Sequence, residues 1–440
     1  MKFLRKFFSP SLLLLSIFLF SYTFYKSEII WNGEKIHLYG VYYIFSFLLF
    51  IFSIFTFYLN RVVKEYLIIS FIATLIGIYL CESYFTFVVY SKTYHPFIEK
   101  IYKSETGNNF DSRTRIEIYN DLKKENPNIT VTSYPFDYLK NKDNDILPLS
   151  GISNSKTIYC NENGYYSIYD SDRYGFNNPN EEWDKIKIDY LLIGDSFTHG
   201  ACVNRPDDLA SVLRTLSGEP ALNLGYGNNG PLIEYATLRE YLKPNITNVI
   251  WIYYEKNDLR GLSEELKNKI LKFYLDDLNF SQDLKGKQNI INKMSRDKIN
   301  EAHNQAFVRK LIKFIKIYNL RYFIFNPPQK EFKNIDDQTI SQFKKILELT
   351  KKLTIENQSK LYFVYLPEYT RYSNDDYKND FYNIVKEILR KLDISFIDIH
   401  EELFIKEKNP LKLFPFELNN HYTVDAYRKI AKIIYQESLR

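Results

Sequence analysis

Three long apolar stretches near the start of the chain most restrict what it can fold into. They cover residues 7–25, 38–59 and 66–89 and consist largely of Leu, Ile, Phe, Tyr and Val. A helix that crosses the hydrocarbon core of a bilayer needs about 20 such residues, and each stretch meets this length. We therefore expect residues 1–90 to form a membrane domain with three transmembrane helices.

The first stretch has a second interpretation. Lys2, Arg5 and Lys6 precede it, as basic residues precede a cleaved secretory signal. However, no small-x-small cleavage site follows, and two more apolar stretches come next, which favours three spanning helices. Together with Arg61 and Lys64 between the second and third stretches, these basic residues place the N-terminus inside. The C-terminal part is then expected on the extracytoplasmic side of the cytoplasmic (inner) membrane.

Residues 188–200 contain a strand that ends in a polar turn. The apolar run 188–193 leads into Gly194-Asp195-Ser196, and a helical pattern follows over residues 207–216. Open α/β folds bind their ligands at the carboxyl ends of their strands. A serine there becomes a nucleophile when a base accepts its proton. Taken alone, Gly-Asp-Ser is equally consistent with an ordinary turn.

Two further apolar segments also end in polar loops. Residues 221–224 precede Gly225, residues 249–254 precede a loop with Asn257, and His421 lies shortly before a final helical pattern. Strand and helix patterns continue to alternate over residues 338–356, 360–366, 376–392 and 394–399. This alternation predicts an α/β fold with a parallel sheet and helices on both faces.

The order and spacing of these blocks resemble the SGNH (GDSL-type) hydrolases, in a membrane-anchored form, over residues 185–440. The resemblance implies a three-layer α/β/α sandwich of the flavodoxin-like type and ester hydrolysis without a metal or organic cofactor. It implies that Ser196 is the nucleophile and His421 the base. It also implies an oxyanion hole formed by the amides of Ser196 and Gly225 with the side chain of Asn257.

The chain departs from the pattern of this family at two positions. Glu255 stands where the family has the glycine of Gly-x-Asn-Asp, and Leu418 stands where it has an aspartate, three residues before His421. A carboxylate at that position would orient the histidine and stabilise the imidazolium. Glu417 is a candidate orienting acid, and the alternative is a Ser-His dyad oriented by a backbone carbonyl.

Other polar residues near the predicted turn have more than one interpretation. His199 is expected to face away from the reacting serine, in a structural or substrate-edge role, and Asp195 is expected to stabilise the turn. Cys160 and Cys202 lie in the exported part, where an oxidising compartment permits a disulfide between them. The alternative is two unrelated buried thiols. Cys81 lies in the third apolar stretch, where it is expected to act only as a small apolar side chain.

The remaining segments lack a catalytic motif. Residues 91–184 are expected to form an extracytoplasmic linker and pre-catalytic segment, with a short hairpin within 155–180 that packs on the catalytic domain. Residues 261–326 are expected to be a helical insertion, as a lid, a groove wall or a solvated surface. Glu82, late in the third apolar stretch, is either a functional intramembrane carboxylate or a side chain that reaches the interface.

These features limit the function. The net charge is +5, without a basic repeat or zinc-ligand spacing, which gives no support for a nucleic-acid partner. A site held outside the inner membrane is expected to remove or transfer acyl groups, such as O-acetyl, on cell-surface glycans (exopolysaccharide, O-antigen or peptidoglycan). Three spanning helices are too few to form a channel that carries acyl groups across the membrane, which favours an esterase over an acyltransferase. The alternative is a non-catalytic membrane scaffold or glycan-binding protein in polysaccharide assembly, which Leu418 favours.

Overall fold

The computed structural model describes residues 2–33, 35–89, 96–140, 145–325 and 335–439. It divides into two compact units. The first contains Met1–Ser91 and Lys310–Pro327, and the second contains Lys92–Arg309 and Pro328–Arg440. The pre-catalytic segment thus belongs to the unit that holds the sheet, whereas part of the expected insertion belongs to the unit with the apolar helices.

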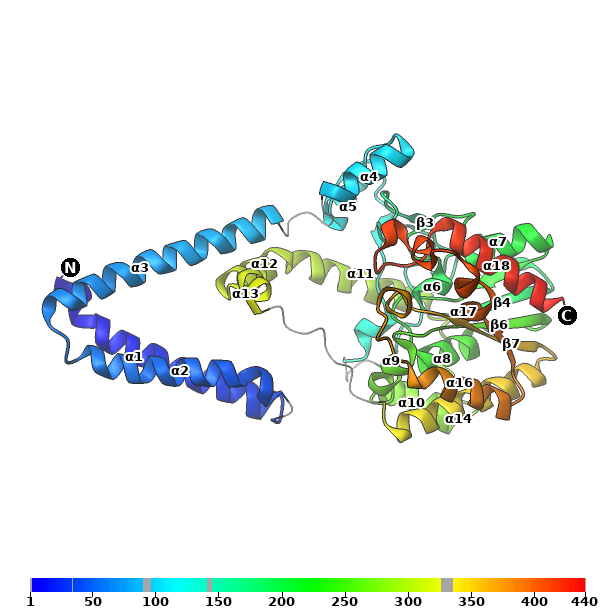
Figure 1. Cartoon of the computed structure of the whole chain (residues 1–440). Coiled ribbons are helices and arrows are strands. Elements are labelled where there is room, and N and C mark those ends of the chain that lie inside the picture. Colours follow the sequence, from blue (N-terminus) through cyan, green and yellow to red (C-terminus); the bar gives the residue numbers. More distant parts are fainter. Residues whose placement is uncertain (1, 34, 90–95, 141–144, 326–334, 440) are drawn as a thin grey trace. The chain divides into compact units, whose positions relative to one another are not determined.

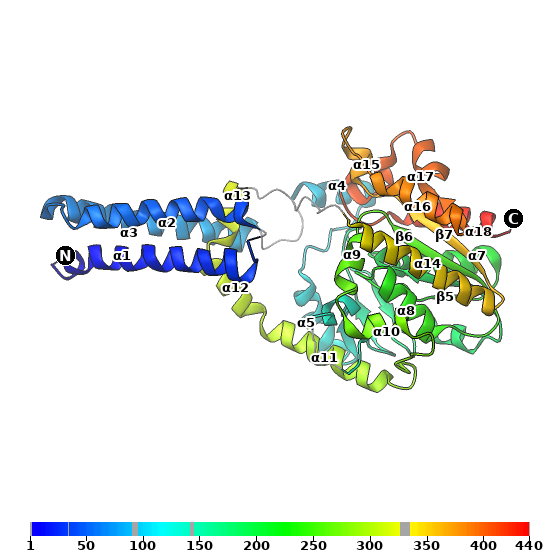
Figure 2. The same ribbon diagram turned by 90° about the horizontal axis from the view of Figure 1, so that it is seen from below.

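The first unit contains three helices that are long and apolar enough to cross a membrane. They are α1 (Lys2–Phe24), α2 (Ile36–Thr56) and α3 (Arg61–Tyr84), and π-helical turns extend α1 over Tyr25–Ile30 and α3 over Phe85–Val89 (η2). α1 and α2 lie side by side (Figure 2). An ion pair of 3.0 Å between Arg5 and Glu65 joins the first turns of α1 and α3. The three predicted apolar helices are confirmed.

A parallel sheet of five strands forms the centre of the second unit. Its strands are β4 (Ile188–Gly194), β5 (Ala221–Asn223), β6 (Ile246–Tyr254), β7 (Lys360–Leu366) and β8 (Ser395–Asp398), in the order β5-β4-β6-β7-β8. Side chains alternate between the two faces, as the pleat of a strand requires. Along β6, Trp251 and Tyr253 enter one hydrophobic core, and Ile252 and Tyr254 enter the other.

Helices cover both faces of this sheet (Figure 1). α8 (Pro231–Tyr241), α14 (Asp337–Glu356) and α16 (Asp380–Lys391) lie on one face, and α7 (Leu209–Ser217) and α18 (Val424–Ser438) lie on the other. Connections between parallel strands must cross over a face of the sheet, and helices make these crossings. The three-layer α/β/α architecture predicted from the alternating pattern is confirmed.

Further helices complete the second unit. They are α4 (Pro96–Thr106), α5 (Arg115–Glu125), α6 (Ser196–His199), α9 (Asp258–Glu265), α10 (Lys269–Asp276), α11 (Gln288–Asn304), α15 (Thr370–Ser373) and α17 (Ile399–Glu402). A small second sheet precedes the main one. In it β1 (Ile129–Val131) runs parallel to β2 (Lys156–Ile158), which pairs antiparallel with β3 (Ile168–Asp170). The loop between β2 and β3 reaches the site described below.

Candidate active site

Ser196 follows β4 directly, at the first position of α6. Gly194, before it, has a φ of +150°, and a Cβ there would lie 2.1 Å from Thr198 Oγ1. A side chain at this position would therefore clash, and only glycine fits. Asp195 caps α6, since its Oδ1 accepts a hydrogen bond of 2.8 Å from the Phe197 amide. Strand, glycine and cap together fix Ser196 at the carboxyl end of a central strand.

His421 approaches the serine from the loop before α18. Its Nε2 lies 2.8 Å from Ser196 Oγ. The neighbouring Tyr422 is buried, and its hydroxyl donates a hydrogen bond of 2.6 Å to the Pro367 carbonyl. The Phe197 ring lies 4.7 Å from the imidazole, centroid to centroid. The histidine is thus held where its ring nitrogen can accept the serine proton.

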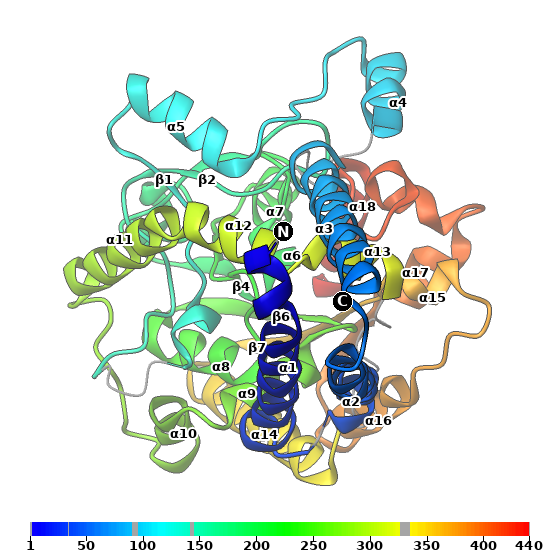
Figure 3. The same ribbon diagram turned by 90° about the vertical axis from the view of Figure 1, so that its left-hand side faces the viewer.

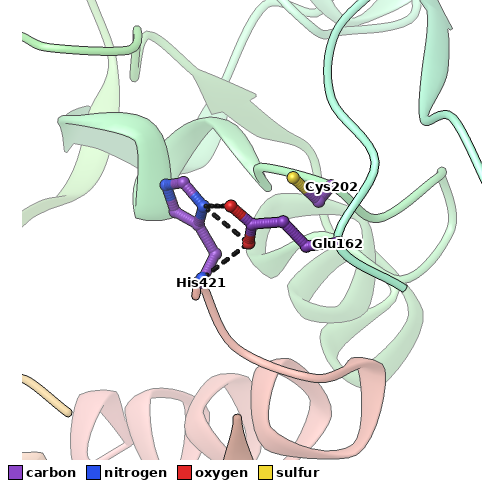
Figure 4. Close-up of side chains that lie close together, drawn as sticks. All are labelled: Glu162, Cys202 and His421. Carbon is purple, nitrogen blue, oxygen red and sulfur yellow. Dashed lines mark hydrogen bonds and ion pairs between the residues drawn. The ribbon is translucent and has the colours of Figure 1, made fainter. Parts of the chain in front are cut away.

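A carboxylate on the opposite side of the imidazole comes from the β2–β3 loop (Figure 4). His421 Nδ1 lies 3.1 Å from Glu162 Oε1 and 3.0 Å from Oε2, and the His421 amide donates to Oε2 at 2.7 Å. With the proton on Nδ1, the lone pair of Nε2 faces Ser196. Glu162 therefore fixes both the tautomer and the backbone of the histidine.

The two groups shift each other's pKa. Burial is the largest influence on both and disfavours their charged forms, but the attraction between them outweighs it. As a result, the pKa of Glu162 lies below its usual value and the pKa of His421 lies above its usual value. The arrangement favours the imidazolium, the form that the ring takes after it accepts a proton.

Glu417, the acid considered from the sequence, lies elsewhere. It is exposed, and its Oε1 accepts a hydrogen bond of 3.2 Å from Asn409 Nδ2. Phe416 and Glu417 both have a φ of +55°, and this turn is held where the Glu417 carbonyl accepts from Tyr369 at 2.9 Å. Leu418 is 40% exposed. The structure thus places Glu162, and not Glu417, beside the imidazole.

A disulfide holds the loop that carries Glu162. Cys160 and Cys202 are bonded, with their Cα atoms 5.0 Å apart, and Asn163 Nδ2 donates to the Cys202 carbonyl at 3.0 Å. The bridge joins the β2–β3 loop to the segment that follows α6. Sγ of Cys202 also lies within 4.8 Å of the carboxylate and imidazole (Figure 4). Because this sulfur is not a thiolate, the cluster does not suit a metal ion. Cys81 is free and exposed.

Two of the three residues expected to form the oxyanion hole, Gly225 and Asn257, differ in their hydrogen bonds. The Gly225 amide donates to Asn223 Oδ1 at 2.9 Å, and a Cβ at Gly225 would lie 2.5 Å from Thr198 Cβ. Asn257 Nδ2 donates to Asp195 Oδ2 at 3.3 Å. A side-chain amide carries two hydrogens, so one remains for another acceptor. Asn257 thus reaches the nucleophile turn, whereas the Gly225 amide already has a partner.

His199 is buried within a cluster of aromatic rings. Its ring centroid lies 4.6 Å from that of Tyr159 and 4.8 Å from that of Tyr169, and its Nδ1 is 3.2 Å from the Gly225 carbonyl. Burial lowers the pKa of His199 to about 4. The ring is therefore neutral at ordinary pH and occupies a structural place beneath the turn.

Glu255, which replaces a glycine of the family pattern, joins two elements of the fold. Its carboxylate accepts hydrogen bonds from Arg371 Nε at 3.1 and 3.0 Å and from the Glu368 amide at 2.9 Å. Burial raises the pKa of Glu255, but Arg371 outweighs it and the pKa lies below its usual value. This substitution thus supplies a buried ion pair between the end of β6 and the segment after β7.

A cavity of about 450 Å³ is lined by residues of α5, of the β1 region and of α11. Figure 3 shows where these three elements lie in the fold. Basic, acidic and aromatic side chains line it, including Arg115, Lys298, Asp137, Glu301 and Tyr134. The Tyr134 ring lies 6.3 Å from that of Tyr159, which in turn contacts His199 in α6. The cavity therefore borders the layer of rings under the nucleophile turn, although neither Ser196 nor His421 lines it.

Comparison with known proteins gives a distant likeness. No protein-family model matches the chain, and no curated protein is significantly similar to it. The chain is similar to the solved structure of a proposed lipolytic protein of the G-D-S-L family from Desulfitobacterium hafniense. The match has 13% sequence identity and a TM-score of 0.31, and it covers 57% of this chain and 99% of that chain. At this TM-score the similarity carries no weight for the function, which must be inferred from the site.

Proposed function

We propose that this chain is a membrane-anchored serine esterase of the SGNH type. Ser196 is the nucleophile, His421 the general base and Glu162 the orienting acid. The observation that supports this most strongly is the hydrogen-bonded series from Ser196 Oγ through both ring nitrogens of His421 to Glu162. A nucleophile next to a base that a third group orients is the arrangement that serine hydrolases use on unrelated folds.

The reaction proceeds through an acyl-enzyme. Ser196 Oγ attacks the ester carbonyl carbon while His421 Nε2 takes the serine proton, and Glu162 stabilises the imidazolium. The tetrahedral intermediate collapses, and the leaving alkoxide takes the proton from His421. Water, deprotonated by His421, then attacks the acyl carbon and releases the acid and Ser196. With a sugar hydroxyl in place of water, the same steps transfer the acyl group.

The negative charge on the carbonyl oxygen needs hydrogen-bond donors. We assign this role to the Ser196 amide and to the second amide hydrogen of Asn257. The Gly225 amide joins them only if it shares its hydrogen with Asn223, its partner at 2.9 Å. The oxyanion hole therefore depends more on Asn257 than the family pattern implies.

We further propose that the substrate is an acylated cell-surface glycan and that the acyl group is O-acetyl. The disulfide between Cys160 and Cys202 supports an extracytoplasmic site, because such bonds persist in oxidising compartments. The apolar helices support a site held near the membrane.

The competing function is a non-catalytic scaffold or glycan-binding protein in polysaccharide assembly. Its main support in the sequence was Leu418, which leaves the usual position of the acid without a carboxylate. Glu162 provides a carboxylate from another part of the chain and so weakens this alternative.

The first test uses the full chain in lipid nanodiscs. A fluorophosphonate probe is expected to label the wild-type protein, and p-nitrophenyl acetate is expected to be hydrolysed. Both signals should disappear in Ser196→Ala and His421→Ala, whereas Ser263→Ala, at an exposed serine of α9, should retain them. A folded wild type that is neither labelled nor active would favour the scaffold.

The second test addresses the substrate. Release of acetate from O-acetylated polysaccharide, measured with and without an added unacetylated acceptor glycan, separates the two reactions. Free acetate in both conditions indicates an esterase, and acetate that appears on the acceptor indicates a transferase. No release from any glycan by an enzyme that hydrolyses p-nitrophenyl acetate would contradict the proposed substrate class.

A further inference from the structure

Part of the expected insertion belongs with the apolar helices. α12 (Ala306–Ile315) and α13 (Tyr318–Phe325) follow α11, and Lys310–Pro327 falls in the same compact unit as Met1–Ser91. The chain therefore leaves the unit with the sheet after Arg309 and returns to it after Pro327. A lid over the active site would not need such a return to the apolar helices.

A buried carboxylate of α3 holds the start of α13. Glu82 has an exposed fraction of 0%. Its Oε2 accepts the Leu320 amide at 2.8 Å, and its Oε1 accepts the Asn319 amide at 3.2 Å and Asn319 Nδ2 at 3.1 Å. Thr86 also donates to Oε1, at 3.0 Å. The first amides of a helix have no partner within the helix and bind a carboxylate well, so Glu82 acts as the N-terminal cap of α13.

Ring contacts and further hydrogen bonds extend this attachment. They join the α12–α13 segment to α2, α3 and η2: Phe314 to Tyr79 (5.4 Å between ring centroids), Phe323 to Phe85 (4.9 Å), the Tyr79 hydroxyl to the Ile315 carbonyl (3.1 Å) and Arg321 to the Tyr42 hydroxyl (3.3 Å). Tyr42 is near the start of α2, and Glu82 is near the end of α3. The segment is thus docked where α2 begins and α3 ends.

The rest of the segment exposes apolar side chains. Phe323 is 63% exposed, and other large apolar residues of the part that belongs to the first unit are exposed as well: Leu311, Ile312, Ile315, Tyr318, Tyr322 and Ile324. Residues 306–325 also contain five basic residues (Arg309, Lys310, Lys313, Lys316 and Arg321) and no acidic residue. An amphipathic, basic segment of this kind is typical of helices that lie in the interface of a membrane.

We infer that the α12–α13 segment is a membrane-interface anchor. Its apolar side chains enter the headgroup–acyl boundary of the bilayer that α1–α3 span, to a depth of about 5–10 Å. Its lysines and arginines bind anionic lipid headgroups, and Glu82 fixes the segment to α3. The inference rests on the membrane anchoring in the proposed function but not on the esterase activity.

A lipid surface suits this segment better than a protein partner. The exposed apolar surface continues that of α3, whose Leu80 and Tyr84 are 66% and 58% exposed. α3 is long and apolar enough to span a membrane. The lipid that would cover its outer face would therefore also cover the exposed face of α12–α13. Five basic charges without an acidic one match the negative charge of anionic lipid headgroups. Under this inference, residues 306–325 have a role other than the lid, groove wall or solvated surface that the sequence left open for 261–326.

The test measures how deeply a fluorophore at one chosen position of the full chain lies in the membrane. In a Cys81→Ala background, which keeps the disulfide, Phe323→Cys is labelled with an environment-sensitive NBD fluorophore. The protein is placed in vesicles of phosphatidylcholine and phosphatidylglycerol that contain lipids with a nitroxide at a shallow or a deep acyl position. Ile51→Cys in α2 reports on the spanning helices, and Leu278→Cys, exposed in the unit with the sheet, reports on water.

We expect blue-shifted emission at position 323 and stronger quenching by the shallow nitroxide than by the deep one. Position 51 should be quenched best by the deep nitroxide, and position 278 by neither. If the probe at position 323 is quenched by neither nitroxide, like that at position 278, while the probe at position 51 is quenched, the inference is wrong, although the helices do span the membrane. Blue-shifted emission without nitroxide quenching would indicate a protein partner or a second copy, which also overturns it.

Substitutions of Glu82 test its role as the N-terminal cap of α13. Glu82→Ala is expected to reduce nitroxide quenching at position 323, because the start of α13 loses its cap, and Glu82→Gln should give a smaller loss. Glu65→Gln, at the opposite end of α3, is the matched control and should leave quenching unchanged. Equal quenching in all variants would overturn the role of Glu82. In a Ser196→Ala background the quenching should persist, which separates this result from failure of the esterase proposal.

Discussion

Glu162 accepts hydrogen bonds from both Nδ1 and the backbone amide of His421, at 3.0 and 2.7 Å, although the two residues lie 259 positions apart in the chain. Two bonds from one carboxylate restrict both the rotation of the imidazole and the position of the loop that carries it. The same histidine contacts Ser196 through its other ring nitrogen. The proposed esterase thus obtains its acid from a loop outside the main sheet.

Replacing this acid should slow the reaction strongly. Glu162→Gln is expected to reduce kcat/KM for p-nitrophenyl acetate by roughly 10²–10⁴-fold, since an amide no longer stabilises the imidazolium and can favour the wrong tautomer. Glu417→Gln is the matched control and should retain wild-type activity. A large loss in Glu417→Gln with little loss in Glu162→Gln would reverse the assignment.

The pH dependence of the reaction should reflect the same pair. His421 must be neutral to accept the serine proton, and Glu162 raises its pKa. Activity should therefore rise with pH through a pKa above the ordinary value of 6.5 and be lost below it. Without the carboxylate, burial lowers the pKa of the imidazole, so the acid limb of kcat/KM in Glu162→Gln should move to lower pH. An acid limb at the same pH in both proteins would show that Glu162 does not act on the base.

Restoring the family aspartate should not help. Leu418 stands at the position of the family acid, but its side chain is 40% exposed and Glu162 already occupies the place beside Nδ1. We expect Leu418→Asp to leave kcat within about twofold of wild type, because an exposed carboxylate interacts weakly. Leu418→Asp should also fail to rescue Glu162→Ala. Rescue in the double variant would mean that the loop can supply the acid itself.

The ion pair of Glu255 should matter for stability. Arg371→Met leaves a buried carboxylate without its charged partner, which is expected to lower the free energy of unfolding by about 3–5 kcal/mol. Glu255→Gln combined with Arg371→Met should recover part of this loss. Tryptophan fluorescence in a Trp31→Phe background reports on the unit with the sheet, where Trp183 and Trp251 are buried. Equal stability of all three proteins would show that the pair contributes little.

Much of the fold could be predicted because its signals are local. An apolar run that ends in a glycine and polar residues marks a strand and the loop after it, which identified β4, β6 and the turn with Ser196. The role of the late histidine, His421, was implied by the resemblance of the order of motifs to the SGNH hydrolases. These features depend on residues close together in the chain, and the structure brings Ser196 and His421 to within 2.8 Å.

The parts that could not be predicted depend on contacts between distant segments. No local pattern distinguishes Glu162 from other carboxylates in polar loops, and Glu417 was nearer in sequence to His421. The expected pairing of Cys160 with Cys202 did contain a signal, because it brings a carboxylate two residues from Cys160 close to the nucleophile turn. Similarly, Glu82 has its partner at Asn319, and only the fold shows why an acid is buried in an apolar helix.

The disulfide should therefore affect catalysis as well as stability. Replacing Cys160 and Cys202 by alanine removes the bond that holds the Glu162 loop against the segment after α6. Loss of a native disulfide is expected to lower the free energy of unfolding by about 2–5 kcal/mol. In the fraction that remains folded, the loop is less restricted and Glu162 spends less time beside Nδ1.

This variant should resemble a weaker form of Glu162→Gln. Its kcat should fall, and the acid limb of its pH profile should move to lower pH, whereas Cys81→Ala should match the wild type in both measurements. Reducing the wild-type protein with dithiothreitol should give the same change, and reoxidation should reverse it. A reduced protein that is less stable but keeps its kcat and its acid limb would show that hydrogen bonds alone hold Glu162 at His421.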